Sequence, residues 1–139
     1  MEKREYSITS NYNEVASICK NVRVFCLNLG FDSTACNEIE ICLTEALNNI
    51  VKHAYKEDFS KNININVFSD DGWVKFELID KGISRKEFNK PKLEFDPNDI
   101  ENLPEGGMGL FIIDQLMDEI SYKTENGVNI FTMKKILFR

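Results

Sequence analysis

The spacing of hydrophobic residues changes along this chain, and the change limits the folds open to it. Apolar residues recur every three or four positions over residues 15–29, which is typical of a helix with one buried face. A second helix is predicted from a cap at Asp32 or Ser33 to about Tyr55. The same periodicity predicts a third helix over residues 110–117.

Five shorter segments alternate between apolar and polar residues, as half-buried strands do. They cover residues 3–9, 63–67, 74–78, 120–123 and 128–135. Tight-turn signals at Asp70-Asp71-Gly72 and Asn126-Gly127 join the last four segments into two hairpins. This order predicts an α+β fold, a two-layer sandwich. A mixed, mostly antiparallel sheet of about five strands, with the first at an edge, would carry three helices on one face.

Composition is that of an ordinary soluble globular protein, and it excludes several functions. The 139 residues suffice for one buried core, so we expect a single domain over residues 1–139. A formal net charge of −6 and the lack of a basic run argue against nucleic acid or an anionic membrane as the main partner. No apolar run approaches the ~20 residues of a transmembrane helix.

The cysteines and the N-terminal residues indicate the cellular compartment in which the protein is expected. The four cysteines form no C-x-x-C pair and His53 is the only histidine, so a structural zinc site is not expected. Cys19 and Cys26 share one helix face, which indicates packing. The first residues, MEKREYSIT, lack the apolar core of a signal peptide. These features predict a reduced, cytoplasmic protein.

A carboxylate and an amide lie four residues apart in the predicted second helix, in the stretch TEALNNIVKHAY. At this spacing Glu45 and Asn49 share one helix face, so both side chains point into the same space. Glu45 could act as a general base that takes a proton from an attacking hydroxyl, and Asn49 could give its amide oxygen to Mg²⁺. Taken alone, a glutamate such as Glu45 is more often a solvated helix residue, and an asparagine such as Asn49 is more often a surface amide. The pair is more informative, because phosphoryl transfer needs the base and the metal together.

Asp80 ends an apolar strand, where a carboxylate is costly unless it is hydrogen-bonded. It could accept a hydrogen bond from an exocyclic amino group such as that of adenine, which would favour adenine over guanine. A simple turn aspartate before Gly82 is an equally good interpretation of this residue alone.

Three glycines in four residues precede the third predicted helix. Gly106, Gly107 and Gly109 could place backbone N–H groups against phosphates at a helix N-terminus, with Met108 and Leu110 anchoring the loop. A flexible entry to the helix would give the same pattern. Taken with the two preceding segments, the glycines predict a nucleotide site.

Residues 82–104 carry three prolines and many charges, with little periodicity. A connection of that length in a compact domain is usually functional. It lies between two candidate nucleotide contacts, so we expect it to form a lid.

Three stretches resemble the sequence boxes of a known superfamily. TEALNNIVKHAYKED is similar to an asparagine box, E-A-x-x-N followed by H-A-Y. LIDKGIS is similar to a first glycine box, D-x-G, and EGGMGLFIIDQLMDEISY to a second, G-G-x-G-L followed by L-M-D. These boxes occur in this order in the Bergerat-fold, histidine-kinase-like ATPase superfamily. The closest resemblance is to the small bacterial anti-sigma factors with serine-protein kinase activity, and it covers nearly the whole chain.

The resemblance implies a role for each matching residue. In that family the residue matching Glu45 acts as the base, the one matching Asn49 holds Mg²⁺, and the one matching Asp80 binds adenine. The matching glycines shape the pocket and the phosphate loop, and here they are Gly82, Gly106, Gly107 and Gly109. The resemblance also implies ATP and Mg²⁺ as cofactors. It further implies a homodimer that binds a sigma factor and phosphorylates a serine on a STAS-type anti-sigma-factor antagonist.

The chain departs from the family pattern in three places, one of which is a longer predicted lid with the FDP of residues 95–97 displaced. Ser84 replaces the last glycine of the D-x-G-x-G found in many of these proteins, as it also does among the anti-sigma kinases. Pro104 and Glu105 stand where some members carry an arginine that reaches the γ-phosphate. Cationic help would then come from elsewhere. The candidates in the predicted lid are Arg85, Lys86, Lys90 and Lys92.

The leading hypothesis is an ATP-dependent serine-protein kinase that is also an anti-sigma factor. The main alternative is a non-catalytic regulatory module that binds its partner in an ATP-dependent way. A sensor histidine kinase would need a phosphoacceptor helix pair with its own histidine, whereas His53 lies inside the asparagine box. A structural α+β domain with accidental glycines is the remaining alternative.

Overall fold

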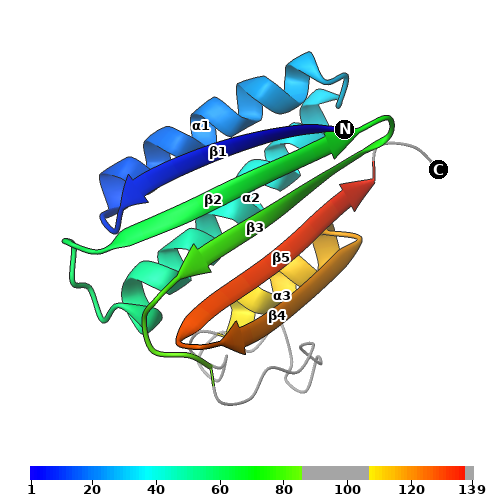
Figure 1. The fold of residues 1–139 in the computed structure, drawn as a ribbon. Helices are drawn as coiled ribbons and strands as arrows, with labels where there is room; N and C mark the ends of the chain where they lie inside the picture. The colour runs from blue at the N-terminus through cyan, green and yellow to red at the C-terminus, as the bar shows by residue number, and fades with distance from the viewer. Residues whose placement is uncertain (86–106, 137–139) are drawn as a thin grey trace, which may run out of the picture.

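A five-stranded sheet carries three helices on one of its faces (Figure 1). The structure is a computed structural model that describes residues 1–85 and 107–136. The predicted α+β sandwich is confirmed. In chain order the elements are β1 (Glu2–Thr9), α1 (Tyr12–Asn28), α2 (Ser33–Asn49), the π-helical turn η1 (Ile50–Ala54), β2 (Asn62–Asp70), β3 (Trp73–Asp80), α3 (Gly107–Leu116), β4 (Glu119–Glu125) and β5 (Val128–Ile136).

The strand order is β1-β2-β3-β5-β4, and every neighbouring pair is antiparallel. The sheet formed by the described strands is therefore antiparallel throughout, not mixed. Strands β3 and β4 run in the same direction, but β5 is inserted between them, so no parallel pair is hydrogen-bonded. The first strand lies at one edge, as predicted.

Alternate residues of each strand face the helices and form the core. In β3, Val74, Phe76 and Leu78 are fully buried. All four cysteines are buried free thiols. Desolvation raises the pKa of Cys26 and of Cys42 to about 12, so these thiols stay protonated at neutral pH. The interpretation of Cys19 and Cys26 as packing residues is confirmed.

Side-chain caps begin both long helices. The Asn11 side chain accepts the Glu14 N–H at 2.8 Å, and the Asp32 carboxylate accepts the Ala35 N–H at 2.8 Å. Asp32 is thus the cap of α2. Gly30, with a φ of +104°, lies just beyond α1, in a conformation that few other residues adopt. None of the helices in the described part of the chain is long and apolar enough to cross a lipid bilayer.

The sequence predicted that the second helix would continue to about Tyr55. In the structure it does not continue as an α-helix that far. It ends at Asn49 and widens into η1, where the Tyr55 N–H donates to the Ile50 carbonyl at 3.0 Å. The Ala54 carbonyl in this turn accepts the Ile83 N–H at 2.8 Å. The segment after β3 is thereby joined to the end of the helix. Single π-helical turns of this kind are frequent at functional sites.

Candidate functional site

A cavity of about 280 Å³ lies beside the end of β3, where η1, α3 and β5 also meet. Most of its wall is apolar, with a small number of polar groups, as in small-molecule binding sites. The wall includes Asn49, Asp80 and Leu110, which come from the three sequence boxes. The structure therefore brings the three boxes together around one cavity.

Asp80 is the last residue of β3 and is only 4% exposed. Its Oδ1 accepts the Gly82 N–H at 2.9 Å and the Asn129 side-chain amide at 2.8 Å. Desolvation raises the pKa of the Asp80 carboxyl, and the bonds from Asn129 and Gly82 oppose part of that rise. Both bonds end on Oδ1, so Oδ2 is the oxygen that a ligand in the cavity can use.

Asn129 is a residue of the site that sequence reasoning missed. It lies opposite Asp80 in the β3–β5 pairing, is 1% exposed, and also donates to the Gly82 carbonyl at 3.0 Å. The Thr124 hydroxyl donates to its side-chain oxygen at 2.8 Å and so fixes the orientation of the amide. The available signal was an amide at a core-facing position of an alternating strand. Nothing in the residue pattern indicates that β3 is its neighbour in the sheet.

Gly82 packs directly against η1. A Cβ atom added to Gly82 would lie 2.6 Å from the Ala54 carbonyl carbon, so a larger residue cannot fit unless the backbone moves. Nearby, the Tyr55 hydroxyl accepts the Lys81 N–H at 2.9 Å and donates to the Asn62 carbonyl at 2.7 Å. These contacts fix the D-x-G segment on the end of the helix.

Glu45 and Asn49 both approach Gly109, in the first turn of α3. A Cβ atom added to Gly109 would lie 2.6 Å from Glu45 Oε2 and 3.4 Å from Asn49 Nδ2. The two side chains thus share one side of α2, and the second glycine box lies against it. Among described residues that line the cavity, Asn49 is included and Glu45 is not. The Glu45 carboxylate instead lies at the beginning of α3, where the helix dipole favours a negative charge.

Two cationic side chains, Lys56 and Arg85, line the cavity. The Arg85 N–H donates to the Tyr122 hydroxyl at 2.9 Å, which fixes the backbone at this point. Lys56 follows η1 with a φ of +52°, a conformation uncommon outside glycine. Arg85 was among the cations expected from the sequence, whereas Lys56 was not. The other candidates lie outside the described residues: Lys86, Lys90 and Lys92.

The second glycine box is placed only in part. Gly107 begins α3, Gly109 contacts α2, and Leu110 lines the cavity. Gly106, the side chain of Met108 and the predicted lid from residue 86 onward lie outside the part of the chain that the structure describes.

A metal held by protein side chains alone does not fit this site. Within residues 1–85 and 107–136, no group of three or more His, Cys, Asp or Glu side chains could hold an ion. Mg²⁺ at nucleotide sites usually takes one or two protein ligands and completes its shell with phosphate oxygens and water. The amide of Asn49 beside the cavity fits that second pattern.

Known proteins resemble this chain in sequence. The profile of the histidine kinase-like ATPase domain family matches residues 8–135. The serine-protein kinase RsbW of Bacillus cereus is 34% identical over 140 residues, which cover 97% of this chain and 86% of the relative. The serine-protein kinase RsbW of Bacillus thuringiensis subsp. konkukian is 33% identical over 139 residues, with the same coverage of 97% and 86%.

Solved structures of low sequence identity share the fold. The crystal structure of the RsbU and RsbW domains of a Mycobacterium tuberculosis protein has a TM-score of 0.69 at 19% identity. The match covers 99% of this chain and 32% of that longer one. The SiaB–SiaC complex from Pseudomonas aeruginosa gives a TM-score of 0.61 at 13% identity, covering 96% of this chain and 89% of the matched one. At these identities the likeness shows the fold alone.

Proposed function

Because this chain belongs to the histidine kinase-like ATPase domain family, and within it to the family of the serine-protein kinases RsbW, we propose a specific activity for it. Residues 1–139 form one ATP-binding kinase domain that phosphorylates a serine of a STAS-type anti-sigma-factor antagonist. The same protein sequesters a sigma factor. The observation that carries the proposal is the convergence of Asn49, Asp80 and Leu110 on one cavity, beside the contact between Glu45 and Gly109.

Adenine is bound at the end of β3 in this proposal. Asp80 Oδ2 accepts a hydrogen bond from the exocyclic amino group of the base. Asn129 and the Gly82 N–H both bond to Oδ1 and so hold the carboxylate in a fixed orientation. A hydrogen bond to a buried carboxylate is strong because little water competes for it.

The phosphates lie between α2 and the beginning of α3. Backbone N–H groups at a helix N-terminus bind phosphate, and Gly109 allows close approach because it has no side chain. Asn49 would hold Mg²⁺ through its amide oxygen, and the ion would neutralise charge on the phosphate oxygens. Lys56 and Arg85 line the same cavity and supply positive charge from the protein.

Glu45 accepts the proton of the attacking serine hydroxyl. Its contact with Gly109 supports this role, because the proposed phosphate site also borders Gly109 and a base for this transfer has to lie near the phosphates. Asp80 lies at the other end, on β3. The two carboxylates therefore serve different steps, nucleotide binding and proton removal.

Transfer of labelled phosphate from ATP to a purified STAS-type antagonist tests the kinase activity. We expect label on the antagonist with the wild-type protein. Glu45→Ala should reduce transfer by about 10² or more while ATP still binds, since a positioned base typically contributes 10²–10⁴-fold. Glu40→Ala is the matched control, because Glu40 lies on the same helix and pairs with Arg23 on the surface. Equal transfer by the wild type and Glu45→Ala would contradict the role of Glu45.

One observation favours a second candidate, a non-catalytic module that binds its partner in an ATP-dependent way. The Glu45 carboxylate lies against α3 and is not among the described residues of the cavity wall. In this candidate, nucleotide binding moves α3 and so changes a surface that binds the partner, and no phosphate is transferred. ATP-dependent capture of a sigma factor, with no label on any antagonist, would support this candidate over the kinase.

We also propose that the protein is a homodimer. Strand β1 lies at the edge of the sheet, so one side of its backbone has no neighbouring strand among the described residues. Its first residues carry charges of both signs, negative at Glu2 and Glu5 and positive at Lys3 and Arg4. Sedimentation velocity at micromolar concentration measures the mass, and a monomer throughout that range would contradict the dimer.

A further inference from the structure

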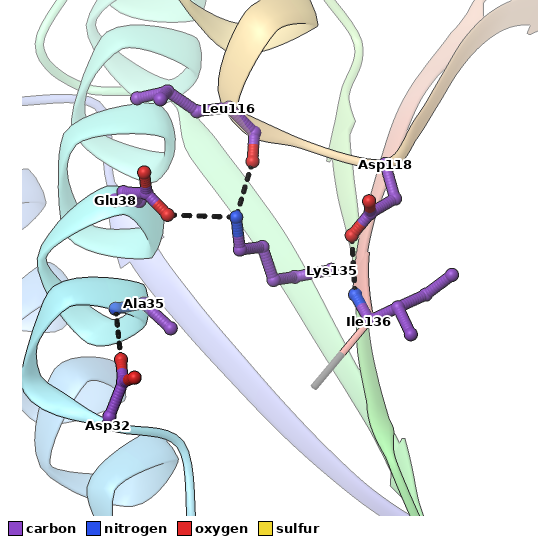
Figure 2. A network of polar contacts seen from close by, with 7 residues as sticks. All are labelled: Asp32, Ala35, Glu38, Leu116, Asp118, Lys135 and Ile136. Carbon is purple, nitrogen blue, oxygen red and sulfur yellow. Dashed lines mark hydrogen bonds and ion pairs between the residues drawn. The ribbon is translucent and has the colours of Figure 1, made fainter. Parts of the chain in front are cut away.

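The two ends of α3 are in contact with charged side chains from other elements. At its beginning, the Glu45 carboxylate of α2 lies against Gly109. At its end, the Lys135 ammonium group of β5 donates to the Leu116 carbonyl at 2.6 Å (Figure 2). A helix favours an anion at its N-terminus and a cation at its C-terminus, and α3 has no basic residue in its own last turn. Both charges are therefore supplied by neighbouring elements.

Lys135 is bound to α2 as well. Its ammonium group donates to Glu38 Oε1 at 2.9 Å, and the Lys135 side chain is only 12% exposed (Figure 2). Glu38 precedes Glu45 by seven residues, about two helical turns, so both carboxylates lie along one side of α2. One helix thus holds α3 at both ends. Glu45 contacts its beginning directly, and Glu38 reaches its end through Lys135.

The turn after α3 is also fastened to β5. Asp118 Oδ2 accepts the Ile136 N–H at 2.6 Å (Figure 2). The Asp118 N–H donates to the Lys134 carbonyl at 2.9 Å. The C-terminal end of α3 is therefore fixed by bonds on both sides of Lys135. Gly109 lies seven residues before Leu116, or ~10 Å along the helix axis. Where Gly109 lies depends on where this end is held.

We propose that Lys135, held by Glu38, is a positioning residue that sets the place of α3 along its axis and keeps Gly109 against Glu45. This inference rests on the proposed function, in which Glu45 is the base and Gly109 borders the phosphates. A shift of α3 changes the distance between base and phosphate, and a misplacement of about 1 Å can cost 10²-fold in rate. The polar contacts proposed for adenine lie on β3 and β5, whereas the described residues that α3 contributes to that cavity wall, such as Leu110, are apolar, so we expect ATP binding to change less than the rate.

Lys135→Met tests the inference, since it keeps an unbranched side chain and removes the charge and the donors. We expect kcat for phosphoryl transfer to fall about tenfold, with the KM for ATP within about twofold of the wild type. Lys134→Met is the matched control, because Lys134 is the next residue of β5 and lies over the Trp73 ring at 4.8 Å instead. It should leave both constants unchanged. Lys135→Arg, which can still donate to both acceptors, should recover most of kcat.

A role limited to stability would give a different result. Lys135→Met would then lower the Tm and leave kcat per folded molecule unchanged, which would overturn the inference. A further arm combines Lys135→Met with Glu45→Ala. If Lys135 acts through the Gly109–Glu45 contact, its loss should have little further effect once Glu45 is gone. Fully additive losses would also overturn the inference.

The Gly109 amide gives a readout that does not depend on catalysis. In ¹H–¹⁵N spectra, Lys135→Met should shift the Gly109 signal and speed its hydrogen exchange, and Lys134→Met should not. Glu38→Gln, which keeps the side-chain shape, provides the same test if Lys135→Met folds poorly. An unchanged Gly109 signal in both variants would overturn the inference even in an active kinase. If the wild-type protein transfers no phosphate, the proposed function is refuted. A Gly109 signal that still shifts in Lys135→Met would then support the positioning of Gly109 by itself.

Discussion

Two opposing demands meet at Asp80. Burial makes its charged form costly, and the bonds from Asn129 and Gly82 recover only part of that cost, so the pKa of the carboxyl stays raised. In the proposed function, the same burial gives the nucleotide base a fixed acceptor with little competition from water. A residue of this kind trades stability of the free protein for ligand binding, as functional residues often do.

The stability of the Asp80→Asn variant should depend on pH in a defined direction. The folded-state pKa of Asp80 is raised above its ordinary value of 3.8, so the native state binds this proton more tightly than the unfolded chain. Asp80 therefore costs stability as pH rises from that value through the folded-state pKa. Asparagine removes this cost and keeps an oxygen for both hydrogen bonds. We expect a higher Tm than the wild type at pH 7.5 without nucleotide, with a difference that shrinks towards pH 4.

Thermal unfolding followed by circular dichroism between pH 4 and pH 8 checks this expectation. The same variant should bind ATP about tenfold more weakly by calorimetry, because an amide can present a donor to the adenine amino group. A difference in Tm that does not vary with pH would contradict the cost assigned to the buried charge. Wild-type affinity for ATP would contradict the adenine contact.

Gly109→Ala tests the contact between α3 and α2. The added methyl group would lie 2.6 Å from Glu45 Oε2, so the carboxylate has to move. We expect phosphoryl transfer to fall by about 10², while the thermal stability changes little, since alanine favours the helix by up to ~1 kcal/mol and offsets the crowding. Gln115→Ala, at an exposed position of the same helix, is the control. Full activity in Gly109→Ala would show that Glu45 needs no fixed place.

At the scale of elements, the helix predicted from hydrophobic periodicity and the observed helix differ at the end of α2. The spacing that places Glu45 and Asn49 on one side of the helix follows from the α-helical period, and the structure retains it. The period does not reveal the π-helical turn that begins at Ile50, because the same apolar residues can be buried by either kind of turn. The turn is accompanied by tertiary bonds, such as that from Ile83 to Ala54.

The beginning of α2 gives a prediction for this element. The Asp32 carboxylate accepts the Ala35 N–H at 2.8 Å and caps the helix that carries Glu38 and Glu45. Asp32→Ala should lower the free energy of unfolding by about 1 kcal/mol, because it leaves an N–H without its side-chain acceptor. Asp32→Asn keeps the acceptor and should change the free energy of unfolding by only a few tenths of a kcal/mol. Urea titration measures both variants, and equal losses would mean that charge, rather than the cap bond, stabilises this end.

At the scale of the whole molecule, the insertion of β5 between β3 and β4 assembles the site. It places Asn129 opposite Asp80 and brings Lys135 to the end of α3. Neither pair is close in sequence. Strand β5 therefore contributes both to the proposed adenine site, through Asn129, and to the proposed positioning of α3, through Lys135.

Nucleotide binding to the whole molecule should raise its thermal stability. A ligand that binds only the native state stabilises by about 2.7 kcal/mol at a hundred times its Kd. We expect ATP with Mg²⁺ to raise the Tm in a saturable way and GTP to have a much smaller effect, since Asp80 favours an exocyclic amino group at the adenine position. Differential scanning fluorimetry measures this response. No response to ATP would favour a purely structural domain.

The local pattern of the sequence determined the helices and strands and the relative positions of several residues within them. Hydrophobic periods predicted the helices and strands, the Asn126-Gly127 turn predicted a hairpin, and helical spacing placed Glu45 beside Asn49. The tertiary structure alone decided that Asn129 bonds to Asp80, that Lys56 lines the cavity and that Lys135 bonds to the Leu116 carbonyl at the end of α3. The reason is physical. Periodicity is set by neighbours along the backbone, whereas strand order and side-chain contacts across the sheet are set by how distant segments pack.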